Sequence, residues 1–150
     1  MRSVLVDTNV LLRWISLDDP GHPPAVAAVD ALRDRGDEMY VTPQNLVEFW
    51  GVATRPHSAN GFAMDGATAR GELEKIEELF KLAPDLPSVY PAWRRLVAAG
   101  GVSGKQVHDA RLAAVMIAHG ISHILTFNTG DFERYPGVTA VHPAEVVPLP

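Results

Sequence analysis

The chain has 150 residues, a length that fits one domain, so we predict a single domain over residues 1–150. It has no cysteine, which excludes a disulfide framework and thiolate metal sites. The formal net charge of −5 argues against a protein that holds nucleic acid by overall charge, although acids neutralised locally by cations leave nucleic acid open as a substrate. No apolar run is long enough for a membrane span and no targeting segment is evident, so we expect a cytoplasmic protein with no membrane partner.

The amino terminus predicts a buried strand that ends in an acid. Residues 3–6 are mostly β-branched and apolar, as in a central strand of a parallel sheet, and Asp7 follows them directly. Because ligands bind beyond the carboxyl ends of such strands, Asp7 lies where chemistry usually occurs. Asp7 also suits the N-cap of a helix that begins near Asn9, and the sequence leaves both interpretations open.

Strand and helix patterns alternate along the rest of the chain. We predict strands over residues 3–6, 39–42, 82–84, 121–127 and 138–141. We predict helices over residues 9–17, 25–35, 43–54, 65–81, 89–99 and 107–120, with a proline-rich loop over 18–24. The alternation predicts an α/β fold of three layers, with a central parallel sheet of four to five strands flanked by helices.

The helix predicted over residues 43–54 contains a single charged residue, Glu48. Apolar residues surround Glu48 on all sides of the helix, so we expect this helix to be buried. A buried carboxylate costs several kcal/mol unless a cation or several donors meet it. Glu48 therefore needs a partner, which is a metal ion, an arginine or the one wet edge of the helix.

Two further candidate site residues, both acids, lie in the carboxyl-terminal half of the chain. Asp109 is the only acid of its predicted helix and lies in the first turn, where it also suits the helix dipole. The strand over 121–127 leads into Asn128, Gly130 and Asp131, of which Asn128 and Gly130 form a turn whatever the function. Four carboxylates at one edge of a sheet would repel one another unless hard cations such as Mg²⁺ or Mn²⁺ held them, and phosphodiester hydrolysis is the natural chemistry of such a site.

Four motifs in order resemble those of the PIN-domain ribonucleases, specifically the VapC-like toxins of bacterial toxin-antitoxin pairs. The motifs lie at residues 6–10 (VDTNV), 47–49 (VEF), 108–114 (HDARLAA) and 125–132 (LTFNTGDF), so the resemblance spans nearly the whole chain. It implies a PIN-like fold that cuts RNA with one or two Mg²⁺ or Mn²⁺ ions. By position, the catalytic and metal-binding acids would be Asp7, Glu48, Asp109 and Asp131.

The resemblance also implies supporting residues and partners. Thr8 and Thr126 match small hydroxyl residues near the site, and the position of Asn128 varies between acid and amide in the family, so Asn128 is expected to orient substrate or water. With Asn9 and Arg111 these residues form the expected substrate or supporting set. Further candidates for RNA backbone contacts are Lys105, Arg94, Arg95 and Arg55. The implied partners are RNA, a VapB-like antitoxin and a second copy of the chain.

Two other functions fit parts of the pattern. A haloacid-dehalogenase-like phosphatase also places an acid after its first strand, but its second acid would fall at Asn9. A noncatalytic RNA- or protein-binding module could keep the fold without the chemistry, although a decayed site has no need for all four acids. Cleavage of tRNA, rRNA or mRNA by the protein in the presence of divalent cations would distinguish a ribonuclease toxin from these two alternatives.

Overall fold

The structure, a computed structural model, describes residues 1–146, and within them it contains one five-stranded sheet. The strands are β1 (Ser3–Val6), β2 (Glu38–Val41), β3 (Lys81–Leu82), β4 (His123–Leu125) and β5 (Thr139–Val141). They lie in the order β3-β2-β1-β4-β5, and every neighbouring pair is parallel. The parallel sheet and the central place of its first strand are therefore confirmed.

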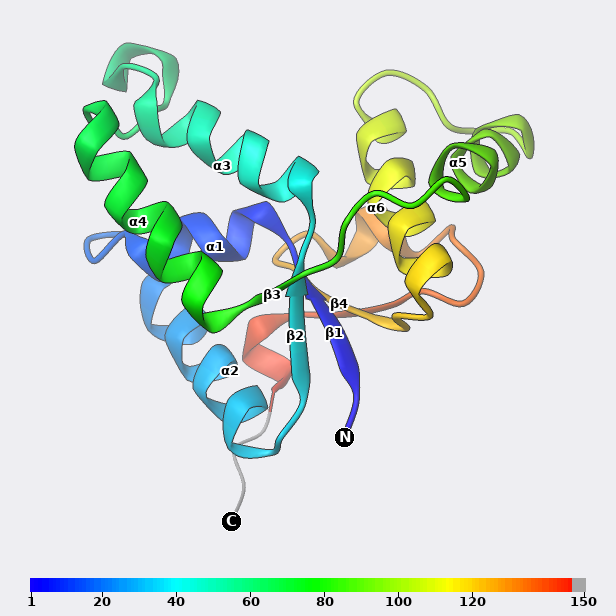
Figure 1. Ribbon diagram of the computed structural model, residues 1–150, viewed down its shortest axis with the longest axis horizontal. Helices are drawn as coiled ribbons and strands as arrows, with labels where there is room; N and C mark the ends of the chain where they lie inside the picture. The colour runs from blue at the N-terminus through cyan, green and yellow to red at the C-terminus, as the bar shows by residue number, and fades with distance from the viewer. Residues whose placement is uncertain (147–150) are drawn as a thin grey trace.

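Helices cover both faces of the sheet. They are α1 (Thr8–Ile15), α2 (His22–Asp34), α3 (Pro43–Thr54), α4 (Gly66–Leu79), α5 (Val89–Ala98) and α6 (Gln106–His119), with short 3-10 turns η1 (His57–Ala59), η2 (Thr129–Phe132) and η3 (Pro143–Glu145). Helices α1 to α4 lie on one side of the sheet, and α5 and α6 lie on the other (Figure 1). This arrangement confirms the three-layer α/β/α fold. No helix within residues 1–146 is long and apolar enough to cross a membrane.

The alternation of side chains along β1 divides the core into two parts. Val4 and Val6 point into the core formed with α1 to α4, whereas Leu5 points into the core formed with α5 and α6. All three side chains are buried, and full burial of one such side chain contributes about 1.5–3 kcal/mol. The apolar run at the amino terminus thus reflects a strand that is covered on both faces.

Helix α2 begins earlier than the sequence predicts. Residues 18–24 were expected to form a loop because they are rich in proline, but α2 starts at His22 and includes Pro23 and Pro24 in its first turn. The backbone N–H groups in the first turn of a helix have no acceptor within the helix, so proline, which lacks an N–H, is tolerated there. The loop prediction was therefore wrong for residues 22–24.

Helix α3 has the predicted bounds, but it is buried on one side only. Phe49 and Ala53 are fully buried, while Val47 is 72% exposed. The helix packs against α1 and α4, and Gln44 in its first turn also bonds residues of α6. The prediction that α3 is buried all round was wrong, because apolar composition does not say how many neighbours a helix has.

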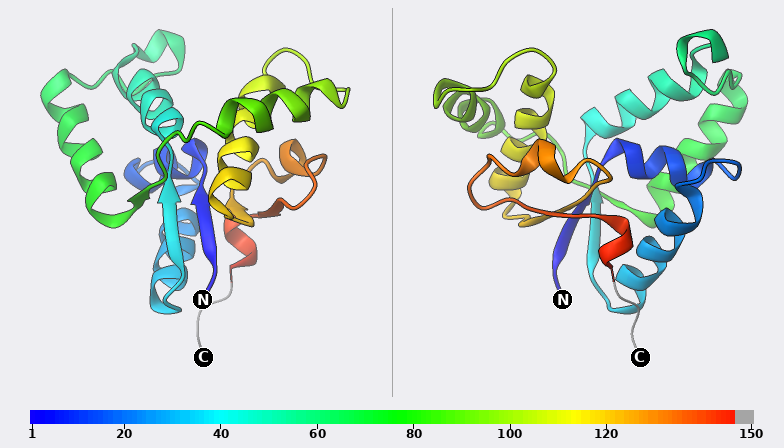
Figure 2. Two further views of the ribbon diagram at one scale, coloured as in Figure 1. Left: turned by 45° about the vertical axis from the view of Figure 1, so that its right-hand side comes forward. Right: turned by 180° about the vertical axis from the view of Figure 1, so that it is seen from behind.

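The topology brings the carboxyl ends of β1 and β4 together. Leu5 pairs with Ile124 and Val6 with Leu125, and the Asp7 N–H donates to the Leu125 carbonyl over 3.0 Å. The segment that follows β4 forms η2, which lies beside α6 (Figure 2, right). Residues that follow β1, those that follow β4 and the first turn of α6 are therefore neighbours.

Candidate functional site

Asp7 is a buried carboxylate at the end of β1, with an exposed fraction of 8%. One oxygen, Oδ1, accepts a hydrogen bond from the Thr8 N–H over 2.8 Å and caps α1. The other oxygen, Oδ2, accepts from Thr126 Oγ1 over 2.8 Å and from Asn9 Nδ2 over 3.3 Å. Asp7 thus caps α1 and also lies at the carboxyl end of β1, so both interpretations of this residue hold.

The electrostatic state of Asp7 reflects competing influences. Burial raises the pKa of Asp7 to about 6, although the bonds from Thr126 and the Thr8 N–H favour the ionised form. The nearby carboxylates of Asp109 and Glu48 contribute to the same rise in pKa. Asp7 is therefore close enough to both acids to sense their charge.

Thr126 and Asn9 join the segments that follow β1 and β4. Asn9 Nδ2 donates to Thr126 Oγ1 over 3.2 Å, and the Phe127 N–H donates to Asn9 Oδ1 over 3.2 Å. The Asn128 N–H donates to Thr126 Oγ1 over 3.0 Å, whereas the Asn128 side chain is exposed. Together these bonds fix the orientation of the Asp7 carboxylate from both strands.

Glu48 is held by hydrogen-bond donors from two helices. Thr8 Oγ1 donates to Glu48 Oε2 over 3.0 Å, and Gln44 Nε2 donates to Glu48 Oε1 over 2.9 Å. The side chain is partly buried. The partners of the Glu48 carboxylate are thus a hydroxyl and an amide. Arg111 does not bond Glu48 itself; its Nη1 donates to Gln44 Oε1 over 3.1 Å.

Two residues of α3 that the sequence analysis left without a role support this arrangement. Asn45 is fully buried; its Nδ2 donates to Thr8 Oγ1 over 3.0 Å, and its Oδ1 accepts from Thr42 Oγ1 over 2.9 Å. Gln44 Nε2 donates to the His108 carbonyl over 3.0 Å as well as to Glu48. A capping box at Thr42 was the only signal available for Asn45, and nothing in the sequence points to Gln44.

Asp109 lies in the first turn of α6 and is partly buried. Its pKa is raised to about 6, mainly by burial and also by the carboxylates of Asp131 and Glu48. The positive charge of Arg134, a residue that the sequence analysis missed, acts in the opposite direction. Within residues 1–146 the Asp109 carboxylate accepts no hydrogen bond and forms no ion pair, unlike the carboxylates of Asp7 and Glu48, which accept side-chain hydrogen bonds.

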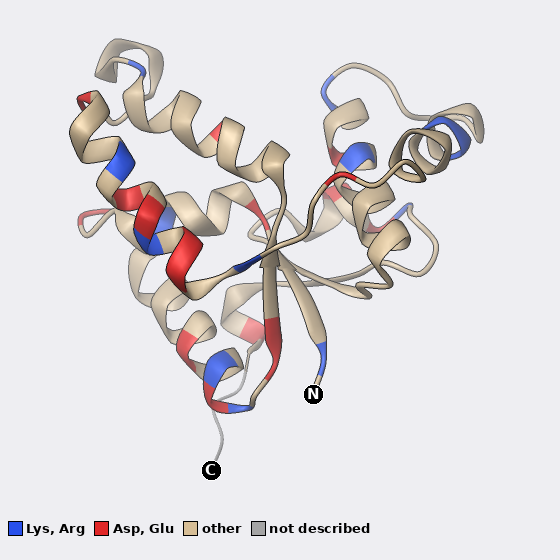
Figure 3. Ribbon diagram, in the orientation of Figure 1, with Lys and Arg blue, Asp and Glu red and all other residues tan. Residues whose placement is uncertain are grey.

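Asp131 lies in η2, where it is exposed. Its influence on the pKa of Asp109 places it within electrostatic reach of the first turn of α6. Acidic segments are visible on both α3 and α6, on opposite sides of the upper end of the sheet (Figure 3). The four predicted acids are therefore electrostatic neighbours that come from four different segments.

The four predicted acids do not form a closed metal site in this structure. Among the described residues, no three His, Asp or Glu side chains form a group that could hold one ion as they stand. The donor set nevertheless fits a hard cation, because its members are carboxylates and the charges of their neighbours raise the pKa of both Asp7 and Asp109. A divalent cation bound by these carboxylates would offset their repulsion.

The predicted basic residues have different surroundings. Arg111 Nη2 lies 3.1 Å from Asp85 Oδ2, so Arg111 forms an ion pair beside the acids. Arg55 lines a small cavity of about 260 Å³ together with Asn9. Lys105, Arg94 and Arg95 are exposed on or next to α5 and α6. Arg111 and Arg55 are thus nearest to the network around Asp7.

Comparison with solved structures finds close similarity of fold over nearly the whole chain. The chain is similar to DNA-bound VapBC from Salmonella typhimurium, with 17% identity and a TM-score of 0.71 over 95% of this chain and 99% of that chain. It is similar to VapBC2 from Rickettsia felis bound to a promoter DNA fragment, with 15% identity and a TM-score of 0.68 over 93% and 98%. It is also similar to the sarcin-ricin loop cleaving toxin VapC20 from Mycobacterium tuberculosis, with 15% identity and a TM-score of 0.57 over 81% and 86%.

The sequence itself gives the family. No curated protein shows significant sequence similarity to the chain. The family profile described as PIN domain matches residues 4–138, which is most of the chain and includes all four acids. The resemblance to the VapC-like proteins is confirmed by the fold, and the chain belongs to the PIN domain family.

Proposed function

We propose that this protein is an endoribonuclease that depends on Mg²⁺ or Mn²⁺ and hydrolyses RNA phosphodiester bonds. The observation that carries the proposal is that the acids lie close enough to affect one another's charge: Asp109 and Glu48 raise the pKa of Asp7, and Asp131 and Glu48 raise that of Asp109. Such a concentration of negative charge costs stability and is typical of functional sites. Membership of the PIN domain family removes the phosphatase alternative.

The residues that would hold the cation are Asp7, Glu48, Asp109 and Asp131. When bound, a divalent cation supplies Lewis-acid activation of water and neutralises charge at the phosphate. Thr126 and Asn9 hold one oxygen of Asp7, and Thr8 and Gln44 hold both oxygens of Glu48, so these two acids are preorganised. Asp109 and Asp131 supply the carboxylates that are free to turn.

The bonds formed by the chain define separate tasks for its residues. Asp7 and Glu48 are fixed by neutral donors, which orient the carboxylates without removing their charge. Arg111, which is bonded to Gln44, and Arg55, which lines a cavity with Asn9, would contact phosphate groups of the RNA backbone. Attack by water leaves a 5′-phosphate and a 3′-hydroxyl, whereas attack by the ribose 2′-hydroxyl leaves a 2′,3′-cyclic phosphate, so the product ends report the nucleophile.

We infer that the nuclease acts as the toxin of a toxin-antitoxin pair. The fold is similar to those of VapBC complexes, and one similar structure is a toxin that cleaves the sarcin-ricin loop. The expected partners are a VapB-like antitoxin and a second copy of the chain. The expected substrates are tRNA, rRNA or mRNA in the cytoplasm, with inhibition of translation as the consequence.

The test is cleavage of purified tRNA and rRNA with Mg²⁺, with Mn²⁺ and with EDTA. We expect cleavage with either cation, none with EDTA, and loss of cleavage in Asp7→Asn and Asp109→Asn proteins whose unfolding transitions remain cooperative. Asp34→Asn, which removes an exposed acid at the end of α2, is the matched control and should cleave like wild type. RNA binding without cleavage under all conditions would support the noncatalytic module instead.

A further inference from the structure

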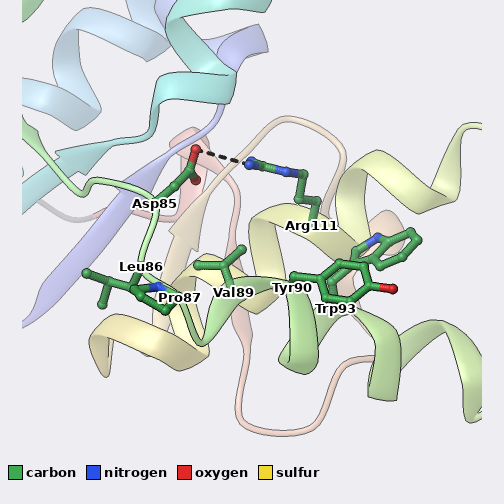
Figure 4. A pocket seen from close by; sticks show the side chains of 7 residues that line it. All are labelled: Asp85, Leu86, Pro87, Val89, Tyr90, Trp93 and Arg111. Carbon is green, nitrogen blue, oxygen red and sulfur yellow. Dashed lines mark ion pairs between the residues drawn. The ribbon is translucent and has the colours of Figure 1, made fainter.

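A cavity of about 470 Å³ is lined by Arg111 and by six residues that have no role in the function proposed above. Its apolar wall consists of Leu86, Pro87 and Val89, which precede and begin α5. Figure 4 shows these side chains on one side of the opening and two aromatic rings on the other. The cavity is therefore formed by the segment between β3 and α6 together with Arg111 of α6.

The aromatic side of the cavity is Tyr90 together with Trp93. Their ring centroids are 6.0 Å apart and the planes are inclined by 30°, so the rings are stacked. Trp93 Nε1 donates to the Val107 carbonyl over 2.8 Å, which fixes the indole, while Tyr90 is 64% exposed. A rigid pair with one ring open to solvent offers a flat surface for a planar ligand.

The polar end of the cavity is the ion pair between Asp85 and Arg111, at 3.1 Å (Figure 4). Both side chains are partly exposed, so their remaining hydrogen-bonding groups are accessible. Asp85 provides acceptors and Arg111 provides donors. The edges of nucleobases present both donors and acceptors, and a base is also planar, whereas an aliphatic ligand would leave the ion pair unused.

A chain of two hydrogen bonds connects this cavity to Glu48. Arg111 Nη1 donates to Gln44, and Gln44 donates to Glu48. On the other side, Trp93 holds the Val107 carbonyl, two residues before Asp109 in the same helical turn. The cavity is therefore linked to Glu48 through Arg111 and Gln44, and to the helical turn of Asp109 through Trp93.

We propose that this cavity binds one unpaired nucleobase of the RNA, stacked on Tyr90 and contacted at its edge by Asp85 and Arg111. The proposal rests on the proposed function, since it takes RNA as the substrate. It assigns Tyr90 the role of a specificity-determining residue, outside the acids that hold the cation. Single-stranded RNA is commonly recognised by splaying a base onto an aromatic side chain in this way.

The first experiment measures binding without cleavage. The four nucleoside monophosphates and ribose 5-phosphate, which lacks a base, are titrated into the protein in EDTA while tryptophan fluorescence is recorded. We expect saturable quenching by at least one nucleotide and none by ribose 5-phosphate. Tyr90→Ala should weaken that binding by about five-fold or more, while Tyr90→Phe, which keeps the ring, should bind like wild type. Leu17→Ala, an exposed apolar position outside the cavity, is the matched control.

The second experiment separates the cavity from the cleavage reaction. Sites cut by wild type and Tyr90→Ala in one mixed-sequence RNA are mapped with Mg²⁺, and we expect the variant to lose preference for the base next to the cut. Absence of quenching by all four nucleotides, or equal binding and equal preference in Tyr90→Ala, would overturn the base-binding proposal while cleavage by wild type continued. A Tyr90→Ala protein that changes from dimer to monomer with unaltered nucleotide binding would also overturn it, and would assign the cavity to contact between copies. If wild type cuts no RNA, the nuclease proposal fails instead, and the binding data still decide whether the cavity takes a base.

Discussion

Thr8 and Glu48 are joined by a hydrogen bond of 3.0 Å, in which the Thr8 hydroxyl donates to the Glu48 carboxylate. The same hydroxyl accepts from the fully buried Asn45 amide over 3.0 Å. One small side chain at the start of α1 thus orients an acid of α3 and satisfies a buried donor. The residue directly after Asp7 therefore couples the end of β1 to the helix that carries the second acid.

Replacing Thr8 with valine tests this coupling. Thr8→Val keeps the shape but removes the hydroxyl, leaving the Asn45 Nδ2 group buried without that partner. We expect a loss of about 1–3 kcal/mol in the free energy of unfolding, measured with urea in EDTA. Thr8→Ser retains the hydroxyl and should lose much less stability; equal stability of wild type and Thr8→Val would contradict the coupling.

The raised pKa of Asp109 makes a prediction about pH. Its pKa is 3.8 in the unfolded chain and about 6 in the folded protein, so the folded state binds the proton more tightly and this contribution to stability disappears as pH rises from about 4 to 6. In EDTA, Asp109→Asn should therefore gain stability relative to wild type across that range, with a constant difference above it. Urea unfolding at pH 4, 5, 6 and 7 provides the measurement. A difference that is flat, or that shrinks as pH rises, would show that the pKa of Asp109 is not raised in the folded protein.

Two glycines with opposite surroundings test the loop that carries Arg55. A Cβ atom at Gly61 would lie 1.9 Å from the Arg55 carbonyl oxygen, whereas a Cβ at Gly71 within α4 meets nothing within 4 Å. Gly61→Ala should lower the thermal midpoint because backbone must move. Gly71→Ala should raise the free energy of unfolding by about 0.5–1 kcal/mol, since alanine favours the helix. Similar midpoints for the two variants would contradict the close approach at Gly61.

The sequence alone predicted those parts of the site and fold that depend on strand order and on local helix signals. A parallel sheet places its carboxyl ends at one edge, so Asp7 and the residues after β4 could be predicted to meet from the strand pattern. The bounds of α3 could also be predicted, because Thr42 and Pro43 are strong start signals. These features depend on local sequence and on general rules of connection.

Features set by the packing of particular side chains could not be predicted. The exposure of Val47 depends on how many elements surround α3, and the bonds made by Gln44 depend on the distance between α3 and α6. Tyr90 and Trp93 are one turn apart in sequence, but the cavity they line also needs Arg111 from another helix. The sequence indicated the acids, while the structure was required to identify what orients them.

The most direct test of the central claim is calorimetric titration of Mn²⁺ into the protein without RNA. We predict saturable binding by wild type, at least about ten-fold weaker binding by each of Asp7→Asn, Glu48→Gln, Asp109→Asn and Asp131→Asn, and unchanged binding by Asp34→Asn. Mn²⁺ binding that survives all four substitutions, or no saturable binding by wild type at neutral pH, would contradict the claim that these acids hold a cation together.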